Sequence, residues 1–194
     1  MAAVIIGSFH YKKLSDPIKW FFYYISFMLI IELTLQIHKH FESENIYLFP
    51  YFQSGEFIIL GTFFSKIFKS KKIHHVAILV TGGLMLANGM FSFLHKQNTI
   101  VGISKILTHS MVIILSAKFL IDSFNQETSN ERSRMVIICQ SLLSYYSLSL
   151  ILFLLLDQLK DITLNSAYLL WGTNNLLLCI FYGISAYVFL KSAK

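Results

Sequence analysis

The sequence predicts an all-α protein, a polytopic bundle of about six transmembrane helices. Of its 194 residues, 55% are hydrophobic and only 13% are charged, whereas a typical soluble domain has roughly 25% charged residues. Its apolar stretches reach the length of about 20 residues that a helix needs to cross about 30 Å of hydrocarbon. They lack the period-two alternation of a transmembrane β-strand, so a membrane barrel is excluded.

Six spans follow one another along the chain with short loops between them. The first is preceded by Pro17 and the second contains Pro50 near its start, where proline is tolerated in a helix. The last is long enough to cross the bilayer with a tilt. The spans are expected over residues 19–37, 47–68, 75–94, 100–121, 135–156 and 164–190.

The two ends of the chain lie outside these spans. Residues 1–18 are expected to form a cytoplasmic or interfacial tail, because the apolar run at residues 2–6 is too short for a signal peptide and has no basic region before it. Residues 19–190 are expected to form one six-helix transmembrane domain, and residues 191–194 a second cytoplasmic tail.

Basic residues are distributed unequally between the two sides of the predicted bundle, twelve on one side and three on the other. Under the positive-inside rule, both termini then face the cytoplasm, with a bacterial inner membrane as the expected location. The net charge of +6 favours anionic lipid headgroups over nucleic acid as the partner, because the charges lie at span ends. The twelve are Lys12, Lys13, Lys19, Lys66, Lys69, Lys71, Lys72, Lys118, Arg132, Arg134, Lys191 and Lys194, and the three are Lys39, Lys96 and Lys160.

Four ionisable residues fall inside the predicted spans, where each needs a partner or a purpose. Glu32 and Lys105 lie toward the outer ends of the first and fourth spans, and Glu56 and His109 lie deeper in the second and fourth. We expect Glu32 to pair with Lys105 and Glu56 with His109. Such pairs can hold helices together, but they also suit a proton relay, an ion path or a buried ligand site, because histidine titrates near neutral pH.

Uncharged polar residues and glycines supply further candidates for contacts between helices. Two adjacent asparagines cannot both face one neighbour, so one of the pair at 174 and 175 should line an interior or an oligomer interface. Three glycines make the third span narrow enough for another helix to approach closely. The polar candidates are Asn88, Gln140, Asn174 and Asn175, and the packing candidates are Gly82, Gly83 and Gly89.

Catalytic and metal-binding motifs are lacking: the sequence has no HExxH, GxSxG, CxxC or P-loop. The stretch HKHFESE at residues 38–44 holds two histidines and two glutamates, but a solvated loop at the headgroups explains it better than a zinc site. We therefore expect no metal and no cofactor.

Three stretches carry a resemblance to known proteins: FFYYISFMLIIEL at residues 21–33, NIYLFPYFQSGEFIIL at 45–60 and AYLLWGTNNLLLCIFYGISAYVF at 167–189. In these the chain resembles a set of small multi-pass membrane proteins of Bacteroidota. Glu32, Glu56, Trp171 and Tyr182 stand where such proteins carry a span-end acid, a mid-span acid and an aromatic pair. The set has no settled activity, so the resemblance transfers no catalytic role.

The chain also resembles the membrane accessory proteins of type VI-B CRISPR systems in its length, its number of spans and its high content of Lys, Ile and Phe. That likeness implies a regulator or membrane effector in antiviral defence. We therefore expect a non-enzymatic, oligomeric and pore-forming or regulatory membrane subunit, which meets a cytoplasmic protein through residues 66–72 and 122–134. The alternatives are a lipid-acting intramembrane enzyme, with Glu56 and His109 in one cavity, and a proton-coupled transporter.

Overall fold

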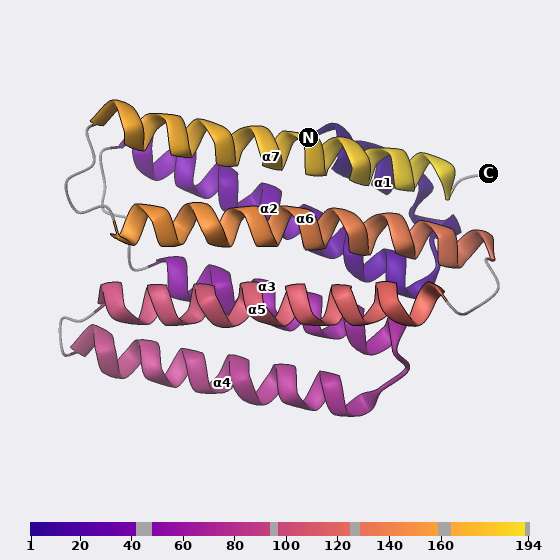
Figure 1. The fold of residues 1–194 in the computed structure, drawn as a ribbon, viewed down its shortest axis with the longest axis horizontal. Coiled ribbons are helices and arrows are strands. Elements are labelled where there is room, and N and C mark those ends of the chain that lie inside the picture. The colour runs from indigo at the N-terminus through magenta and orange to yellow at the C-terminus, as the bar shows by residue number, and fades with distance from the viewer. Residues whose placement is uncertain (42–47, 94–96, 125–128, 159–163, 193–194) are drawn as a thin grey trace. The chain divides into compact units, whose positions relative to one another are not determined.

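The computed structural model describes the chain except for residues 42–47, 94–96, 125–128, 159–163 and 193–194, and its described residues contain helices and no strand (Figure 1). The all-α prediction is therefore confirmed. The elements are α1 (Ala2–His10), the 3₁₀ helix η1 (Tyr11–Lys13), α2 (Asp16–His40), α3 (Phe49–Ile67), α4 (Lys71–Phe93), α5 (Gln97–Phe124), α6 (Asn130–Gln158) and α7 (Leu164–Lys191).

Helices α2 to α7 coincide with the six predicted spans to within a few residues. Within the described residues, four segments are long and apolar enough to cross a membrane: Asp16–His38, Gly102–Phe124, Asn130–Leu155 and Tyr168–Lys191. Helices α3 and α4 are not among them, and the mean hydropathy of α3 is lowered by Gln53, Glu56 and Lys66. The total of six spans and the side on which the termini lie stay predictions.

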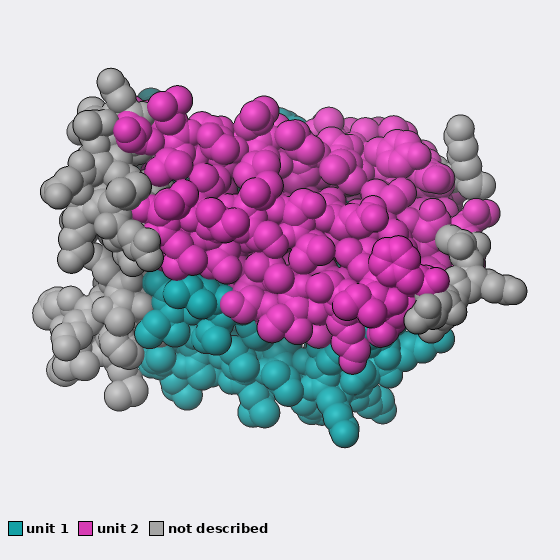
Figure 2. Space-filling model, in the orientation of Figure 1, with its two compact units in different colours: residues 1, 14–108 teal, residues 2–13, 109–194 magenta. Residues whose placement is uncertain are grey.

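The chain forms two compact units. Unit 1 comprises Met1 and Leu14–Thr108, and unit 2 comprises Ala2–Lys13 and His109–Lys194 (Figure 2). The boundary between Thr108 and His109 falls within α5. In unit 1, α3 packs against both α2 and α4; in unit 2, α7 packs against both α6 and α1. The single domain expected over residues 19–190 stays a prediction.

Apolar side chains cover the helix surfaces, while several polar ones are buried. Leu79, Ile114 and Leu169 are 74%, 64% and 73% exposed, whereas Gln53 and Glu56 are 8% and 9% exposed. Soluble proteins rarely expose so much contiguous apolar surface, because it is unfavourable in water. Hydrocarbon around the helices removes that penalty, so this distribution is the one an integral membrane protein requires.

Two glycines of α3 allow the close packing of unit 1. A Cβ atom on Gly61 would lie 2.4 Å from the Cβ of Ala77 on α4, and one on Gly55 would lie 2.4 Å from the ring of Phe27 on α2. The predicted glycines Gly82 and Gly83 are exposed, with no atom within 4 Å of an added Cβ. An approach of another helix at those two positions stays a prediction.

The N-terminal residues are helical and belong to unit 2. Helix α1 packs against α7 with Ala3 and Gly7 buried. These two small residues are four apart and therefore share one face of the helix. The sequence interpretation as a tail did not anticipate this helix.

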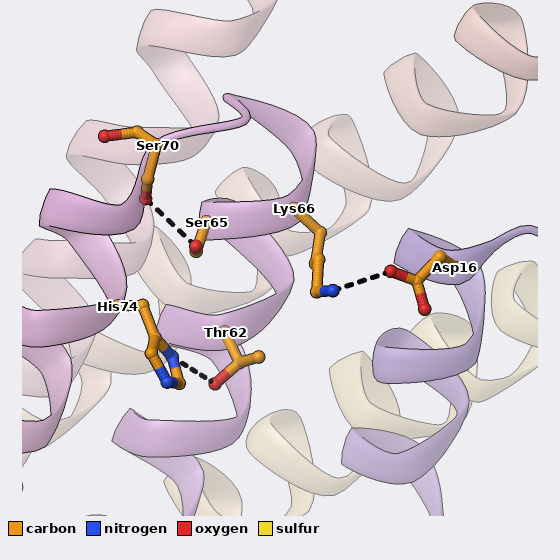
Figure 3. Close-up of polar contacts among 6 residues, drawn as sticks. All are labelled: Asp16, Thr62, Ser65, Lys66, Ser70 and His74. Carbon is orange, nitrogen blue, oxygen red and sulfur yellow. Dashed lines mark hydrogen bonds and ion pairs between the residues drawn. The ribbon is translucent and has the colours of Figure 1, made fainter.

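The turn between α3 and α4 follows Lys66 and includes Lys69, two of the basic residues expected on the cytoplasmic side (Figure 3). Lys69 has a φ of 50°, a left-handed conformation that ends α3. The hydroxyl of Ser65 donates a 3.0 Å hydrogen bond to the carbonyl of Ser70 across the turn. Lys66 forms a 2.8 Å ion pair with Asp16 at the start of α2. Both side chains are exposed, so this pair contributes at most about 1 kcal/mol.

Candidate functional site

Glu56 of α3 is the most buried carboxylate that the structure describes in unit 1, with only 9% of the residue exposed. The Tyr24 hydroxyl of α2 donates a hydrogen bond to its Oε1 atom over 3.5 Å. Lys105 of α5 interacts with it electrostatically. Glu56 therefore joins three helices, and its negative charge is balanced by a phenol and an ammonium group.

A second polar contact lies beside this one on the same helices. The hydroxyl of Ser104, next to Lys105 on α5, donates to the Oε1 atom of Gln53, one turn before Glu56 on α3. Thr108 in turn donates to the carbonyl of Ser104 over 2.9 Å. Unit 1 therefore has a polar layer of four buried residues (Tyr24, Gln53, Glu56 and Ser104) and the half-buried Lys105, which holds α2, α3 and α5 together.

The sequence predicted two ion pairs, Glu32 with Lys105 and Glu56 with His109. Lys105 has Glu56 as a charged partner, whereas its pairing with Glu32, a half-buried residue of α2, stays a prediction. Glu56 belongs to unit 1 and His109 to unit 2. The pairing of Glu56 with His109 therefore also stays a prediction.

His109 contacts α6 within unit 2. Its Nε2 atom lies 3.3 Å from the hydroxyl oxygen of Ser149, and its ring meets that of Tyr146 edge-on with centroids 4.8 Å apart. The residue is 6% exposed. Next to Tyr146, Tyr145 stacks on Phe181 of α7 with ring centroids 5.2 Å apart. This aromatic layer fixes the register between α6 and α7.

A groove of about 530 Å³ runs between α6 and α7 in unit 2. Its wall on α6 includes the predicted residue Gln140 and also Ser144, and its wall on α7 includes Ile180 and Tyr187. Gln140 and Ser144 are exposed, and neither makes a hydrogen bond within the described residues. Neither Glu56 nor His109 lines this groove.

Of the remaining candidates, Asn174 and Asn175 belong to α7 but do not line the groove. Asn175 of α7 is exposed and Asn174 is half-buried, as expected for neighbours on different helix faces. Asn88 and Gly89 belong to α4, but their surroundings lie outside the described residues. The described part of the chain contains no group of three potential metal ligands, and Glu42 and Glu44 lie outside it.

Tyr24, Gln53 and Ser104 were missed by the sequence analysis. Their residue types are common in helix interfaces. Gln53 and Ser104 lie within one turn of Glu56 and Lys105, which was their only signal, and Tyr24 on α2 had none. The groove had no sequence signal beyond Gln140. No protein family matches the chain, and no curated protein or solved structure matches it either.

Proposed function

We propose that the protein is a non-enzymatic integral membrane subunit that assembles with copies of itself through α7. One observation carries the proposal: on the exposed face of α7, a candidate membrane span, lies an asparagine without a hydrogen bond within the described residues. Of the four candidate spans, α7 is the least buried, with 22% of its apolar window inside the protein. Asn175 lies near its middle, is exposed and makes no hydrogen bond within the described residues.

The surroundings of Asn175 form a continuous face. Tyr168, Trp171, Asn175 and Cys179 follow one another at intervals of three or four residues, which places them on one side of a helix. All four are exposed. A lone amide in hydrocarbon is unfavourable, and a hydrogen bond to the same amide of a second copy satisfies both. The groove-lining residues Leu177 and Ile184 lie on the opposite side of α7.

Cys179 makes this interface directly testable, because it is exposed whereas Cys139 is buried. Mild oxidation of the full chain in membranes is expected to yield a dimer linked through Cys179. Asn175→Leu should weaken association by about threefold to twentyfold, the range for hydrogen bonds between membrane helices. Gel analysis of the cross-linked fraction against protein density in the bilayer measures the effect.

Thr173→Val is the matched control, because Thr173 lies on another face of α7 and its hydroxyl already bonds the carbonyl of Leu169. It should leave cross-linking unchanged, and Cys179→Ser should abolish it. A protein that stays monomeric at all densities contradicts the proposal, as does equal cross-linking of wild type and Asn175→Leu.

We further propose that both termini lie in the cytoplasm of a bacterial cell. A protein partner would then meet the subunit at residues 66–72 and 122–134. The first stretch lies at the turn between α3 and α4, and much of the second belongs to α5 and α6. The resemblance in sequence extends the proposal to a regulatory or pore-forming role in antiviral defence.

A proton-coupled transporter is the second candidate, and the buried layer of unit 1 favours it. A carboxylate that meets both a phenol and an ammonium group within a helix bundle can exchange a proton when its partners rearrange. Glu56 would be the coupling residue, with Tyr24 and Lys105 as its partners.

A further inference from the structure

The groove between α6 and α7 suits a flexible apolar chain. Its lining includes Ile137 and Leu148 of α6 and Leu177, Ile180 and Ile184 of α7. A volume of about 530 Å³ falls within the range of roughly 300–1,000 Å³ for small-molecule sites. Both walls belong to candidate membrane spans, so the hydrocarbon tails of lipids have access to it.

One end of the groove is cationic. The ammonium group of Lys191 lies 5.8 Å from the centre of the ring of Tyr187, which lines the groove. Arg134 lies one turn before the lining residue Ile137, and its guanidinium donates a 3.3 Å hydrogen bond to the carbonyl of Lys191. The start of α6 and the end of α7 therefore place two basic side chains at the mouth of one apolar groove.

Arg134 retains capacity for another partner. Its Nε atom is buried and makes no hydrogen bond within the described residues. A guanidinium binds a phosphate through two nitrogens at once, which makes arginine well suited to phosphate groups. The neighbouring Arg132 donates to the carbonyl of Asp122 and lies over the ring of Phe119, and its Nε atom is buried as that of Arg134 is, so this end of unit 2 has two guanidinium groups.

The balance of charge at this end of unit 2 is positive. The end of α5, the start of α6 and the end of α7 carry four basic residues against two acidic ones among the described residues, and Lys12 and Lys13 of η1 belong to the same unit. An occupant that matches the site is apolar along its length and negative at one end. The basic residues are Lys118, Arg132, Arg134 and Lys191, and the acidic ones are Asp122 and Glu131.

We propose that the groove between α6 and α7 binds an anionic phospholipid, with an acyl chain along the groove and the phosphate against Arg134 and Lys191. The site is separate from the assembly face of α7 that includes Asn175. Failure of one proposal therefore leaves the other standing.

Lipid binding can be measured on the full chain purified in a neutral detergent. Native mass spectrometry counts bound phosphatidylglycerol or phosphatidylcholine of the same chain length during titration. Wild type should retain one phosphatidylglycerol in preference to phosphatidylcholine. The double variant Arg134→Gln with Lys191→Gln should lose about thirtyfold in affinity for it, at about fivefold for each charge removed near a headgroup.

Two matched controls distinguish an effect at the groove from the effect of removing any two charges or of adding a large side chain anywhere on α7. Lys71→Gln with Lys72→Gln removes two exposed charges from the start of α4 in unit 1 and should leave binding unchanged. Gly183→Leu places a side chain into the groove and should prevent binding. Gly172→Leu adds the same side chain to α7 away from the groove and should not, because both glycines have open space around them.

Three results would overturn the proposal. The first is equal retention of the two lipids by wild type. The second is an equal loss of affinity in the two double charge variants. The third is a Gly183→Leu protein that keeps its lipid but changes its oligomeric state, since the groove would then hold a helix of another chain.

Discussion

Glu56→Leu is expected to lower the free energy of unfolding by about 3 kcal/mol. Breaking a buried ion pair typically costs about 3–5 kcal/mol, because the partner is left charged in a low-dielectric site. The expected value is at the lower end because Lys105 is half-buried and its long side chain can carry the ammonium group toward water. Replacing both residues with leucine should cost much less than the single change. Denaturant unfolding in detergent micelles measures both.

Two further variants make this test specific. Tyr24→Phe removes the hydroxyl that donates to Glu56 but leaves the electrostatic interaction of Glu56 with Lys105, so it should cost only about 1–2 kcal/mol. Combining Glu56→Leu with His109→Leu tests the pairing predicted from the sequence in the same way. If the single variant Glu56→Leu and its double with Lys105→Leu are equally unstable, Lys105 does not depend on Glu56.

Gly61→Ala is expected to lower the free energy of unfolding by about 1–3 kcal/mol, the usual cost of an overpacked core. On helix propensity alone, the same change would stabilise the protein by about 1 kcal/mol. The opposite sign is expected because the new Cβ would lie 2.4 Å from the Cβ of Ala77, so that α3 and α4 must move apart. Thermal unfolding in detergent, followed by circular dichroism, gives the sign.

The rescue and the control for this variant lie in α4. Ala77→Gly added to Gly61→Ala removes the atom that clashes and should restore most of the lost stability. Gly82→Ala introduces the same methyl group into open space and should be neutral or stabilising. A Gly61→Ala protein that is as stable as wild type would mean that α3 and α4 do not approach closely there.

The helices could be predicted from the sequence, because length and hydropathy are local properties of each segment. All six expected spans coincide with helices. Helix α1 was missed, since its apolar run is short and the signal for its packing, small residues at positions 3 and 7, is weak. The helix is stabilised by contact with α7, which lies at the far end of the sequence.

The contacts between helices were harder to predict, because they depend on the rotation of each helix about its axis. Glu56 and Lys105 were both selected as candidates, but nothing in their positions along the chain indicated that they pair with each other. The glycines at 82 and 83 were expected to allow close packing, whereas Gly55 and Gly61 do so within the described part of the chain. Spacing along one helix does not reveal which face meets a neighbour.

An alkaline carbonate wash of cell membranes tests whether this helical chain resides within a lipid bilayer. The wash releases proteins held at the surface by charge or by partners but leaves spanning helices in place, because no backbone polar group of a span needs water. We expect the protein to stay in the membrane fraction and to be released only by detergent. Release of the intact protein into the soluble fraction would contradict its residence within the bilayer.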